Sequence, residues 1–281
     1  PPFIKTKFSG LIPSTNLYKN FSLNNFIYYK NLINKFLFNR ILKIKNLENI
    51  FVPDNKFINY FKNKNFSKKV KISYDFGYFN EGKQSNYSHK IPLILKKKPK
   101  NKIFILVYGS IRYEKGIQYL LEAISLSNQL KNVVLIIAGK QDQFSKNCIT
   151  YFKKNYLIKN KLIILDYFIS KKLETFLFKI SNYVWTGYTK NYSGSSAVYF
   201  LSSVYFKPVI SSNHGLINFY NKKYKNGFSV EIDNTNKIRN LLNYLAYKPK
   251  KIDKKKFLLI NKKHNQEKFS DNICKFLLFK N

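Results

Sequence analysis

From residue 103 onward, short apolar runs alternate with stretches in which apolar residues recur every three or four positions. The runs predict β-strands, and the stretches between them predict amphipathic helices. A strand–helix unit that repeats every 25–30 residues or so predicts a parallel sheet with helices on both faces. The predicted strands cover 103–108, 133–138, 162–165, 183–186, 208–211 and 228–231, and the predicted helices cover 116–127, 143–154, 171–180, 195–206, 216–224 and 234–247.

The first hundred residues carry a weaker pattern, which still predicts several elements. They are a long helix over 24–45, a strand over 49–52, a helix over 54–63 and a strand over 70–73. The long helix would place five apolar side chains on one face, those of Phe26, Tyr29, Leu32, Ile33 and Phe36. Turn formers and a lysine run over 75–102 predict an interdomain linker, and the tail after Pro249 predicts one or two helices, with 264–279 amphipathic.

The net charge of +37 raises the question of nucleic-acid binding. Only three of the 51 cations are arginines, Arg40, Arg112 and Arg239. Lys, Asn, Ile, Phe and Tyr are abundant while Ala is scarce, as expected for A/T-rich codons. Because base and phosphate recognition favours the arginine fork, we interpret the charge as codon bias spread over a solvated surface. It leaves a positive field that would attract anionic lipid or substrate.

With 44% hydrophobic residues among 281, the chain can bury a sizeable core. It contains no Met and begins Pro1-Pro2, so we expect its natural N-terminus to lie upstream. Its two cysteines show no metal spacing, which fits a reducing compartment. No apolar run approaches the 18 residues or so that a membrane-spanning helix needs.

Ligands of open parallel sheets bind at the carboxyl ends of the strands, and the turn after 103–108 has the residues for a phosphate site there. Gly109 and Ser110 open a short polar turn that contains Arg112 and Lys115 and leads into a helix at about Gly116. Free backbone N–H groups and the helix dipole favour an anion at such a junction. The alternative interpretation, a surface lysine beside a helix-flanking arginine, is weakened by the rarity of Arg in this chain.

A second candidate site follows the strand at 183–186. Small residues there let a ligand approach the backbone, and serine hydroxyls add donors near a helix start; its residues are Ser193, Gly194, Ser195, Ser196 and Val198. A serine N-cap after a turn is the alternative. His214, after the strand at 208–211, is a weaker ligand candidate, and its distance in sequence from His89 and His264 predicts no metal cluster. We predict no bound cofactor.

Five segments together resemble the nucleotide-sugar-binding domain of GT-B glycosyltransferases of the family 4, group 1 type. They are GSIRYEKGIQYLLEA (109–123), VVLIIAGK (133–140), NYVWTGYTKNYSGSSAV (182–198), FKPVISSNHGLINFY (206–220) and NGFSVEID (226–233). The resemblance implies an α/β fold with two Rossmann-like domains. It divides the chain into the end of an acceptor-side domain plus linker (1–95), a nucleotide-sugar domain (96–250) and C-terminal helices that return to the first domain (251–281).

The resemblance also implies roles for individual residues. Arg112 and Lys115 would neutralise the donor diphosphate and act in catalysis. The loop from Ser193 to Ser196 would hold phosphate and sugar, while Gly139, Lys140 and the turn at 166–169, which includes Tyr167 and Phe168, would line the base and ribose pocket. The implied partners are a nucleoside-diphosphate sugar and a glycan or lipid-linked acceptor, with transfer retaining and independent of metal.

One departure from the family pattern bears on activity. Many members carry two glutamates eight residues apart around the second loop, where this chain has Ser193 and Leu201. The resemblance makes a glycosyltransferase of cell-surface polysaccharide synthesis the main hypothesis, cytoplasmic and in contact with the inner face of an anionic membrane, while the missing glutamates motivate a non-catalytic alternative. The alternatives are a non-catalytic sugar-nucleotide-binding protein, an epimerase on the same fold and, from charge alone, a nucleic-acid-binding protein, although we expect no specific nucleic acid partner.

Overall fold

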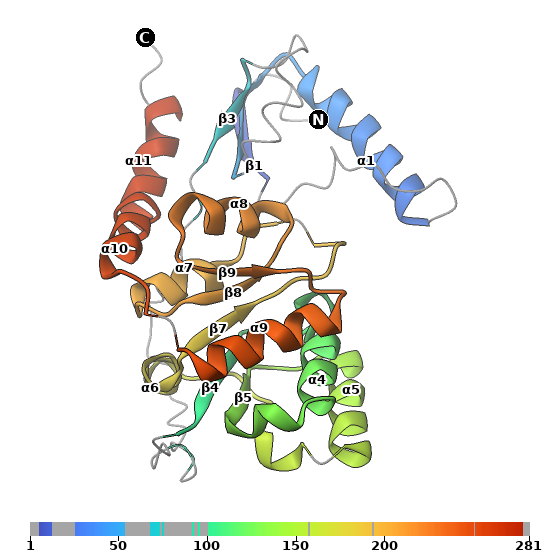
Figure 1. Cartoon of the computed structure of the whole chain (residues 1–281). Coiled ribbons are helices and arrows are strands. Elements are labelled where there is room, and N and C mark those ends of the chain that lie inside the picture. Colours follow the sequence, from blue (N-terminus) through green and yellow to red (C-terminus); the bar gives the residue numbers. More distant parts are fainter. Residues whose placement is uncertain are drawn as a thin grey trace. The chain divides into compact units, whose positions relative to one another are not determined.

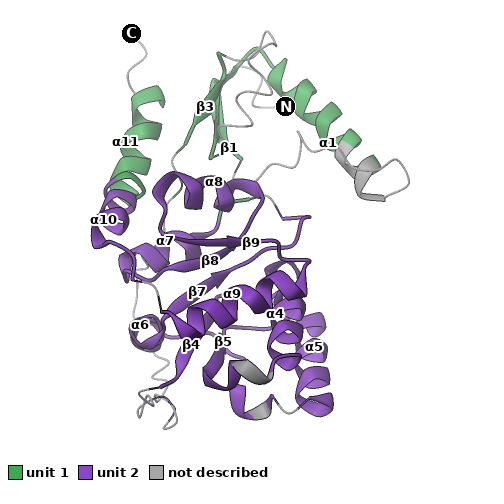
Figure 2. Ribbon diagram, viewed as in Figure 1, with its two compact units in different colours: residues 1–76, 193–195, 263–281 green, residues 77–192, 196–262 purple. Residues whose placement is uncertain are grey.

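The computed structural model divides into two compact units, which Figure 2 distinguishes by colour. Unit 1 consists of residues 1–76, 193–195 and 263–281, and unit 2 consists of residues 77–192 and 196–262. The structure describes residues 6–12, 26–53, 68–73, 75, 92, 95, 101–156, 158–192, 194–249 and 251–277.

Unit 2 is built on a six-stranded sheet in the order β6-β5-β4-β7-β8-β9, in which every neighbouring pair is parallel (Figure 1). The predicted α/β fold with a parallel sheet is therefore confirmed, and four of the six strands have the predicted bounds. The strands are β4 (Ile103–Tyr108), β5 (Val133–Ala138), β6 (Leu162–Leu165), β7 (Tyr183–Thr186), β8 (Val209–Ser212) and β9 (Gly227–Val230).

Helices cover both faces of this sheet, as the uninterrupted apolar strands require. Alternate residues of β4 enter separate cores: Ile105 and Val107 pack in one, Phe104 and Leu106 in the other. The helices of unit 2 are α4 (Ile117–Ser125), α5 (Gln143–Asn155), α6 (Lys171–Ile180), α7 (Ala197–Val204), α8 (Gly215–Tyr224), α9 (Thr235–Tyr247) and α10 (Lys254–Lys263, whose last residue falls in unit 1), with short 3-10 turns η2 (Tyr113–Lys115), η3 (Asn128–Asn132) and η4 (Lys159–Lys161).

Unit 1 contains a three-stranded parallel sheet in the order β1-β2-β3. Its elements are β1 (Phe8–Leu11), α1 (Phe26–Leu42), β2 (Leu47–Val52), β3 (Val70–Ile72) and α11 (Gln266–Leu277). The C-terminal helix belongs to this unit, since the Asn49 side-chain amide donates to the Phe276 carbonyl at 3.3 Å. The His264 ring also lies 2.7 Å from the Asp75 carbonyl oxygen.

The long helix α1 packs through a different face from the one on which the sequence gathers apolar residues. Phe38 and Leu42 enter the core of unit 1 with exposures of 5% and 0%. Leu32, Ile33 and Phe36 are instead 44%, 59% and 57% exposed. The helix therefore presents an apolar surface to solvent.

The predicted helix over 54–63 and most of the predicted linker over 75–102 lie outside the described residues. Within the described ranges, no helix is long and apolar enough to cross a membrane. The described residues also contain no group of three or more His, Cys, Asp or Glu that could hold a metal ion.

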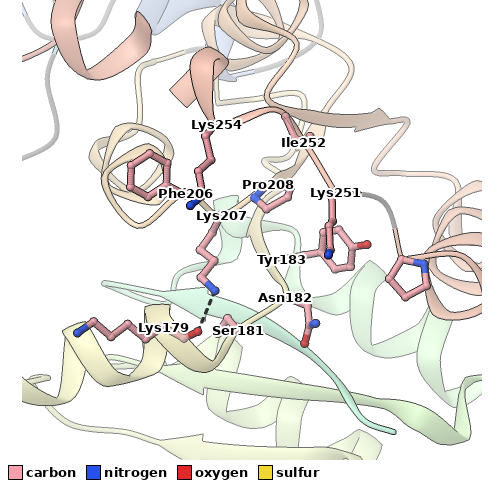
Figure 3. Close-up of a pocket in the computed structure, with 11 residues that line it drawn as sticks. Lys179, Ser181, Asn182, Tyr183, Phe206, Lys207, Pro208, Lys251, Ile252 and Lys254 are labelled. Atoms are coloured by element: carbon pink, nitrogen blue, oxygen red, sulfur yellow. Dashed lines mark hydrogen bonds between the residues drawn. The ribbon is translucent and has the colours of Figure 1, made fainter. Parts of the chain in front are cut away.

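The two edges of the unit 2 sheet differ in what surrounds them. The turns that the sequence predicts as a ligand site follow the carboxyl ends of the strands. The amino ends of β7 and β8 border a pocket of about 370 Å³ that Figure 3 shows.

Candidate functional site

The turn after β4 is held against the neighbouring turn after β5. Ile111 forms an isolated parallel bridge with Gln141, and its N–H donates to the Lys140 carbonyl at 2.8 Å. Two glycines make this approach feasible. A Cβ atom on Gly139 would lie 2.0 Å from the Gly109 carbonyl oxygen, and both glycines have positive φ angles, +137° and +87°.

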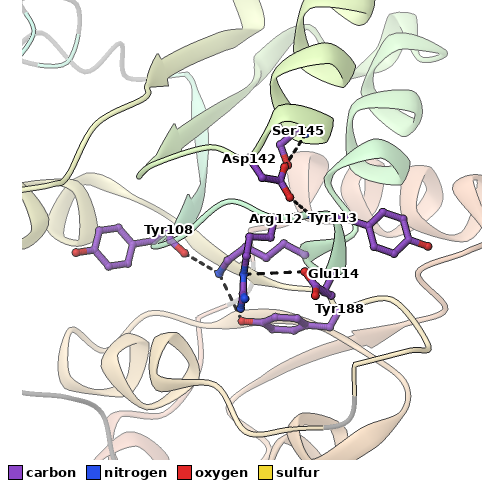
Figure 4. Close-up of polar contacts among 8 residues, drawn as sticks. Tyr108, Arg112, Tyr113, Glu114, Asp142, Ser145 and Tyr188 are labelled. Atoms are coloured by element: carbon purple, nitrogen blue, oxygen red, sulfur yellow. Dashed lines mark hydrogen bonds and ion pairs between the residues drawn. The ribbon is translucent and has the colours of Figure 1, made fainter. Parts of the chain in front are cut away.

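Lys115 is the buried cation of the site, with 7% of its surface exposed. Its ammonium group donates to the Tyr108 carbonyl at 2.8 Å and to the Tyr188 hydroxyl at 3.4 Å, contacts drawn in Figure 4. It also lies 5.4 Å from the centre of the Tyr188 ring. Among the described residues no carboxylate lies within ion-pair distance of Lys115. Burying a cation without a carboxylate partner lowers the stability of the fold, unless a bound anion neutralises the charge.

The adjacent strand β7 fixes the backbone of this turn. The indole N–H of Trp185 donates to the Lys115 carbonyl at 2.8 Å, and both groups are buried. The Thr189 N–H donates to the Glu114 carbonyl at 2.8 Å. The position of the ammonium group is therefore set by two strands rather than by a free loop.

Arg112 differs from Lys115 in being exposed. Its guanidinium Nε lies 4.0 Å from a Glu114 carboxylate oxygen, and the Arg112 side chain is 57% exposed. Such a solvated pair contributes little to stability and leaves most guanidinium donors to solvent. Arg112 is therefore available to a ligand at the end of β4.

Asp142 organises the turn from the β5 side. It is the N-cap of α5, and its carboxylate accepts from the Ser145 N–H at 2.8 Å and the Tyr113 N–H at 3.2 Å. Partial burial opposes its ionisation, but these hydrogen bonds and the Arg112 charge outweigh burial and lower the pKa of Asp142. Asp142 is thus an ionised positioning group and is already occupied by backbone donors.

The turns after β5 and β6 carry the residues predicted for the base and ribose pocket. Lys140 is exposed and Tyr167 half-buried, and Phe168 is 67% exposed. The Gln141 amide is buried, with 7% of the residue exposed, and its Nε2 atom has no partner among the described residues. Its backbone N–H donates to Asp166 at 2.8 Å, so the amide group projects from a fixed backbone.

The turn after β7 brings Tyr188 and Ser196 to Lys115. The hydroxyls of Tyr188 and Ser196 lie 2.9 Å apart, and both residues are buried. The Val198 side chain would lie 3.6 Å from a Cβ atom on Gly109. Ser196 is the N-cap of α7 without a side-chain capping bond, because its hydroxyl is used by Tyr188.

The structure places the other residues of this loop less fully. Ser193 lies outside the described residues, and Gly194 and Ser195 are grouped with unit 1. Leu201 is 5% exposed and packs in the apolar core with Leu106 and Val184. At that position the protein has a core residue rather than an acid.

His214 does not join the Lys115 cluster. Its Nε2 atom lies 3.1 Å from the Thr189 carbonyl oxygen, beside a smaller cavity between the turns after β7 and β9. We therefore regard it as a loop-positioning residue.

The structure unites Gly109, Lys115, Gly139, Ser196 and Val198 at one sheet edge. Tyr188 and Gln141, which contact or flank this set, received no role from the sequence. Both lie two or three residues beyond a predicted strand end, and the strand-end rule places the turns 187–196 and 139–142 at the ligand edge without distinguishing these two residues within them.

The arrangement can bind an anion. Lys115 and Arg112 supply two positive charges, and the turn supplies backbone N–H groups at the end of β4.

Comparisons with known proteins identify the family and the fold. The family model described as Glycosyl transferases group 1 matches residues 94–256, more than half of the chain. No curated protein matches the sequence significantly.

Several solved structures share the fold at low sequence identity. WaaG, a glycosyltransferase involved in lipopolysaccharide biosynthesis, is 14% identical with a TM-score of 0.67, and the match covers 98% of this chain and 76% of WaaG. Sucrose-phosphate synthase from Thermosynechococcus elongatus is 15% identical with a TM-score of 0.71, covering 96% and 66%. HepE from Anabaena, in complex with UDP, is 13% identical with a TM-score of 0.68, covering 96% and 72%. The GT-B fold implied by the resemblance is therefore confirmed.

Proposed function

The chain belongs to the glycosyl transferases group 1 family, and we propose that it transfers a sugar from a nucleoside diphosphate to a glycan or lipid-linked acceptor in cell-surface polysaccharide synthesis. The observation that carries the proposal is the buried Lys115 ammonium, held by Tyr108 and Tyr188 without a carboxylate among the described residues. A donor diphosphate would supply the missing negative charge. The related fold of HepE, solved with UDP-glucose, and of WaaG, which acts in lipopolysaccharide biosynthesis, supports the donor and acceptor classes.

The proposed chemistry follows from where charge develops. When the bond between the sugar carbon and the phosphate oxygen breaks, the nucleoside diphosphate leaves with additional negative charge. Lys115, Arg112 and the turn N–H groups would stabilise that charge, because fixed donors aimed at a leaving group need no reorganisation during reaction. These cations would do what a divalent metal does in a metal-dependent transfer, which is to stabilise the leaving group. We therefore propose that transfer is independent of metal and, as in the family pattern, retains the configuration of the sugar.

The two turns after β5 and β6 would hold the nucleoside. Gln141 offers an amide donor that has no partner among the described residues, and the turn after β6 offers the aromatic rings of Tyr167 and Phe168, the latter 67% exposed. The loop from Ser193 to Ser196 would hold phosphate and sugar.

A second candidate function rests on Leu201. Because this position is in the apolar core, the site has no carboxylate there to contact the donor. A protein that binds sugar nucleotides without transferring them would have this property.

Contact with an anionic membrane is supported by α1. Its exposed apolar side chains lie among Lys35, Arg40 and Lys43, and this helix contains no acidic residue. Apolar side chains flanked by cations favour the interface of anionic lipid bilayers. We propose that the protein acts in the cytoplasm at the inner face of the membrane.

Calorimetry with UDP, GDP and ADP, each with and without EDTA, tests the binding proposal. We expect one nucleotide to bind equally well in both conditions. Absence of binding to all three would contradict both candidate functions, and loss of binding with EDTA would contradict metal independence.

Release of nucleoside diphosphate from its sugar conjugate, in the presence of membrane glycolipid extract, separates the two candidates. Transfer predicts release that depends on the extract. Nucleotide-sugar binding without any release would favour the non-catalytic function.

A further inference from the structure

A second pocket lies at the amino-terminal edge of the unit 2 sheet, opposite the turns described above (Figure 3). Several helices and strands each contribute residues from one of their ends to its lining. Asn182 and Tyr183 come from the start of β7, and Pro208 precedes β8. The end of α6 contributes Lys179, and the segment between α9 and α10 contributes Lys251 and Ile252, with Lys254 at the start of α10. The pocket volume of about 370 Å³ lies within the range of small-molecule sites.

The charge of the lining is one-sided. Lys179, Lys207, Lys251 and Lys254 are four of its 11 residues, and none of the described lining residues is acidic. This lysine share is about twice the share of Lys and Arg in the whole chain.

The lysines differ in how they are occupied. Lys207 donates to the Lys179 carbonyl at 2.8 Å, at the negative end of the α6 dipole. Lys179, Lys251 and Lys254 form no ion pair with any described carboxylate. The nearby Asp253 accepts from the Lys255 N–H at 2.9 Å and does not line the pocket. The Lys179 side chain points away from the other lysines, which leaves the Lys251 and Lys254 ammonium groups available to a ligand in the pocket (Figure 3).

The pocket also has an apolar wall built at a conformational cost. Phe206 has a φ angle of +55°, in the left-handed region that L-residues avoid and glycine adopts freely. Its ring packs against Phe257 at 6.0 Å and lies 5.9 Å from the Lys254 ammonium. This left-handed residue closes the end of α7, where the Lys207 N–H donates to the Ser202 carbonyl at 2.8 Å, and its ring forms part of the pocket wall.

We propose that this pocket binds a phosphate-bearing small molecule whose apolar or ring-shaped body rests against Phe206, Pro208 and Ile252. Lys251 and Lys254 meet the phosphate dianion, since charge-assisted hydrogen bonds to phosphate are strong. The apolar wall and a volume larger than an inorganic ion favour an ester over free phosphate. The site is separate from the donor edge of the same sheet, so its occupant regulates or tethers the protein rather than reacting.

Titration calorimetry of the whole chain with phenyl phosphate, orthophosphate and phenol tests the proposal. We expect phenyl phosphate to bind more tightly than orthophosphate, and phenol not to bind. The double variant Lys251→Gln/Lys254→Gln should weaken phenyl phosphate binding at least tenfold. The matched variant Lys153→Gln/Lys154→Gln, which removes the same charge from the exposed end of α5, should change it less than twofold.

Three results would overturn the proposal. Equal weakening in both double variants would show a general charge effect. Loss of binding in Lys115→Met, or competition by saturating UDP, would place the anion at the donor edge. Absence of any binding to the wild-type chain would refute the site directly. Because the donor site is tested with nucleotides and this pocket with phenyl phosphate, failure of one proposal leaves the other standing.

Discussion

Replacing Lys115 by methionine tests the site most directly. The substitution Lys115→Met keeps most of the side-chain volume, so the void that alanine would leave in this buried position is largely avoided. It removes the donor to Tyr108 and Tyr188, and the charge that we assign to the donor diphosphate. The fold should persist, because Trp185 holds the Lys115 backbone rather than its side chain.

The magnitude follows from the contacts. A hydrogen bond to a charged group contributes about 1.5–3 kcal/mol, which corresponds to about a 10- to 150-fold loss of affinity. The lost hydrogen bond to Tyr108 costs about 1 kcal/mol in stability, but the variant also removes a buried charge, which offsets that loss. The melting temperature should therefore shift by no more than about 2–4 °C in either direction. Binding should therefore fall far more than stability.

Calorimetry with the preferred nucleoside diphosphate measures the affinity, and thermal unfolding measures the stability. The control is Lys255→Met on α10, where the replaced side chain is exposed and both quantities should stay at their wild-type values. Equal nucleotide affinity in Lys115→Met and Lys255→Met, with both proteins folded, would refute the role assigned to this lysine.

Three other substitutions or reactions test local features. Asp142→Ala should destabilise the protein by about 0.5–2 kcal/mol at neutral pH, because it removes the N-cap of α5. The folded pKa of Asp142 lies below its usual value of about 4, so this destabilisation should shrink as the pH falls below that value. A destabilisation that does not change with pH would contradict the capping role. Burial raises the pKa of the Cys148 thiol to about 11, so iodoacetamide at pH 8 should label the exposed Cys274 first. Mass spectrometry follows the labelling, and equal labelling rates at the two cysteines would show that Cys148 is accessible. Lys225 ends α8 with a φ angle of +51°, a left-handed conformation that glycine adopts without strain. Lys225→Gly should therefore stabilise the protein by about 0.5–1 kcal/mol in thermal unfolding. A destabilised variant would argue against the left-handed cap.

The sequence predicts unit 2 well because its strands are continuous apolar runs. Ile103–Tyr108 and Val133–Ala138 are buried on both faces, so composition alone marks their bounds. The β1 strand escaped prediction because Phe8–Leu11 includes Ser9 and Gly10, which interrupt any apolar pattern. Its pairing with β2 is a tertiary interaction that a local pattern does not encode.

The candidate site was predictable in position but not in detail. Strand ends located Arg112 and Lys115, yet nothing in the pattern distinguishes a buried lysine from an exposed arginine three residues earlier. That distinction depends on Tyr188, which is brought to Lys115 from 73 positions away by the pairing of β4 with β7. The exposed face of α1 was hidden for the same reason, since periodicity shows that a helix has an apolar stripe but not what covers it.

The back-to-back glycines of the first two turns limit how this site can vary. No side chain fits at Gly139, because its first carbon would overlap the backbone oxygen of Gly109, and backbone atoms cannot rotate away as a side chain can. The adjacent Lys140 is exposed and meets no such restriction. In a saturation mutagenesis library selected for folded protein, Gly139 should thus tolerate no other residue while Lys140 accepts most of them, an abrupt boundary within a single turn.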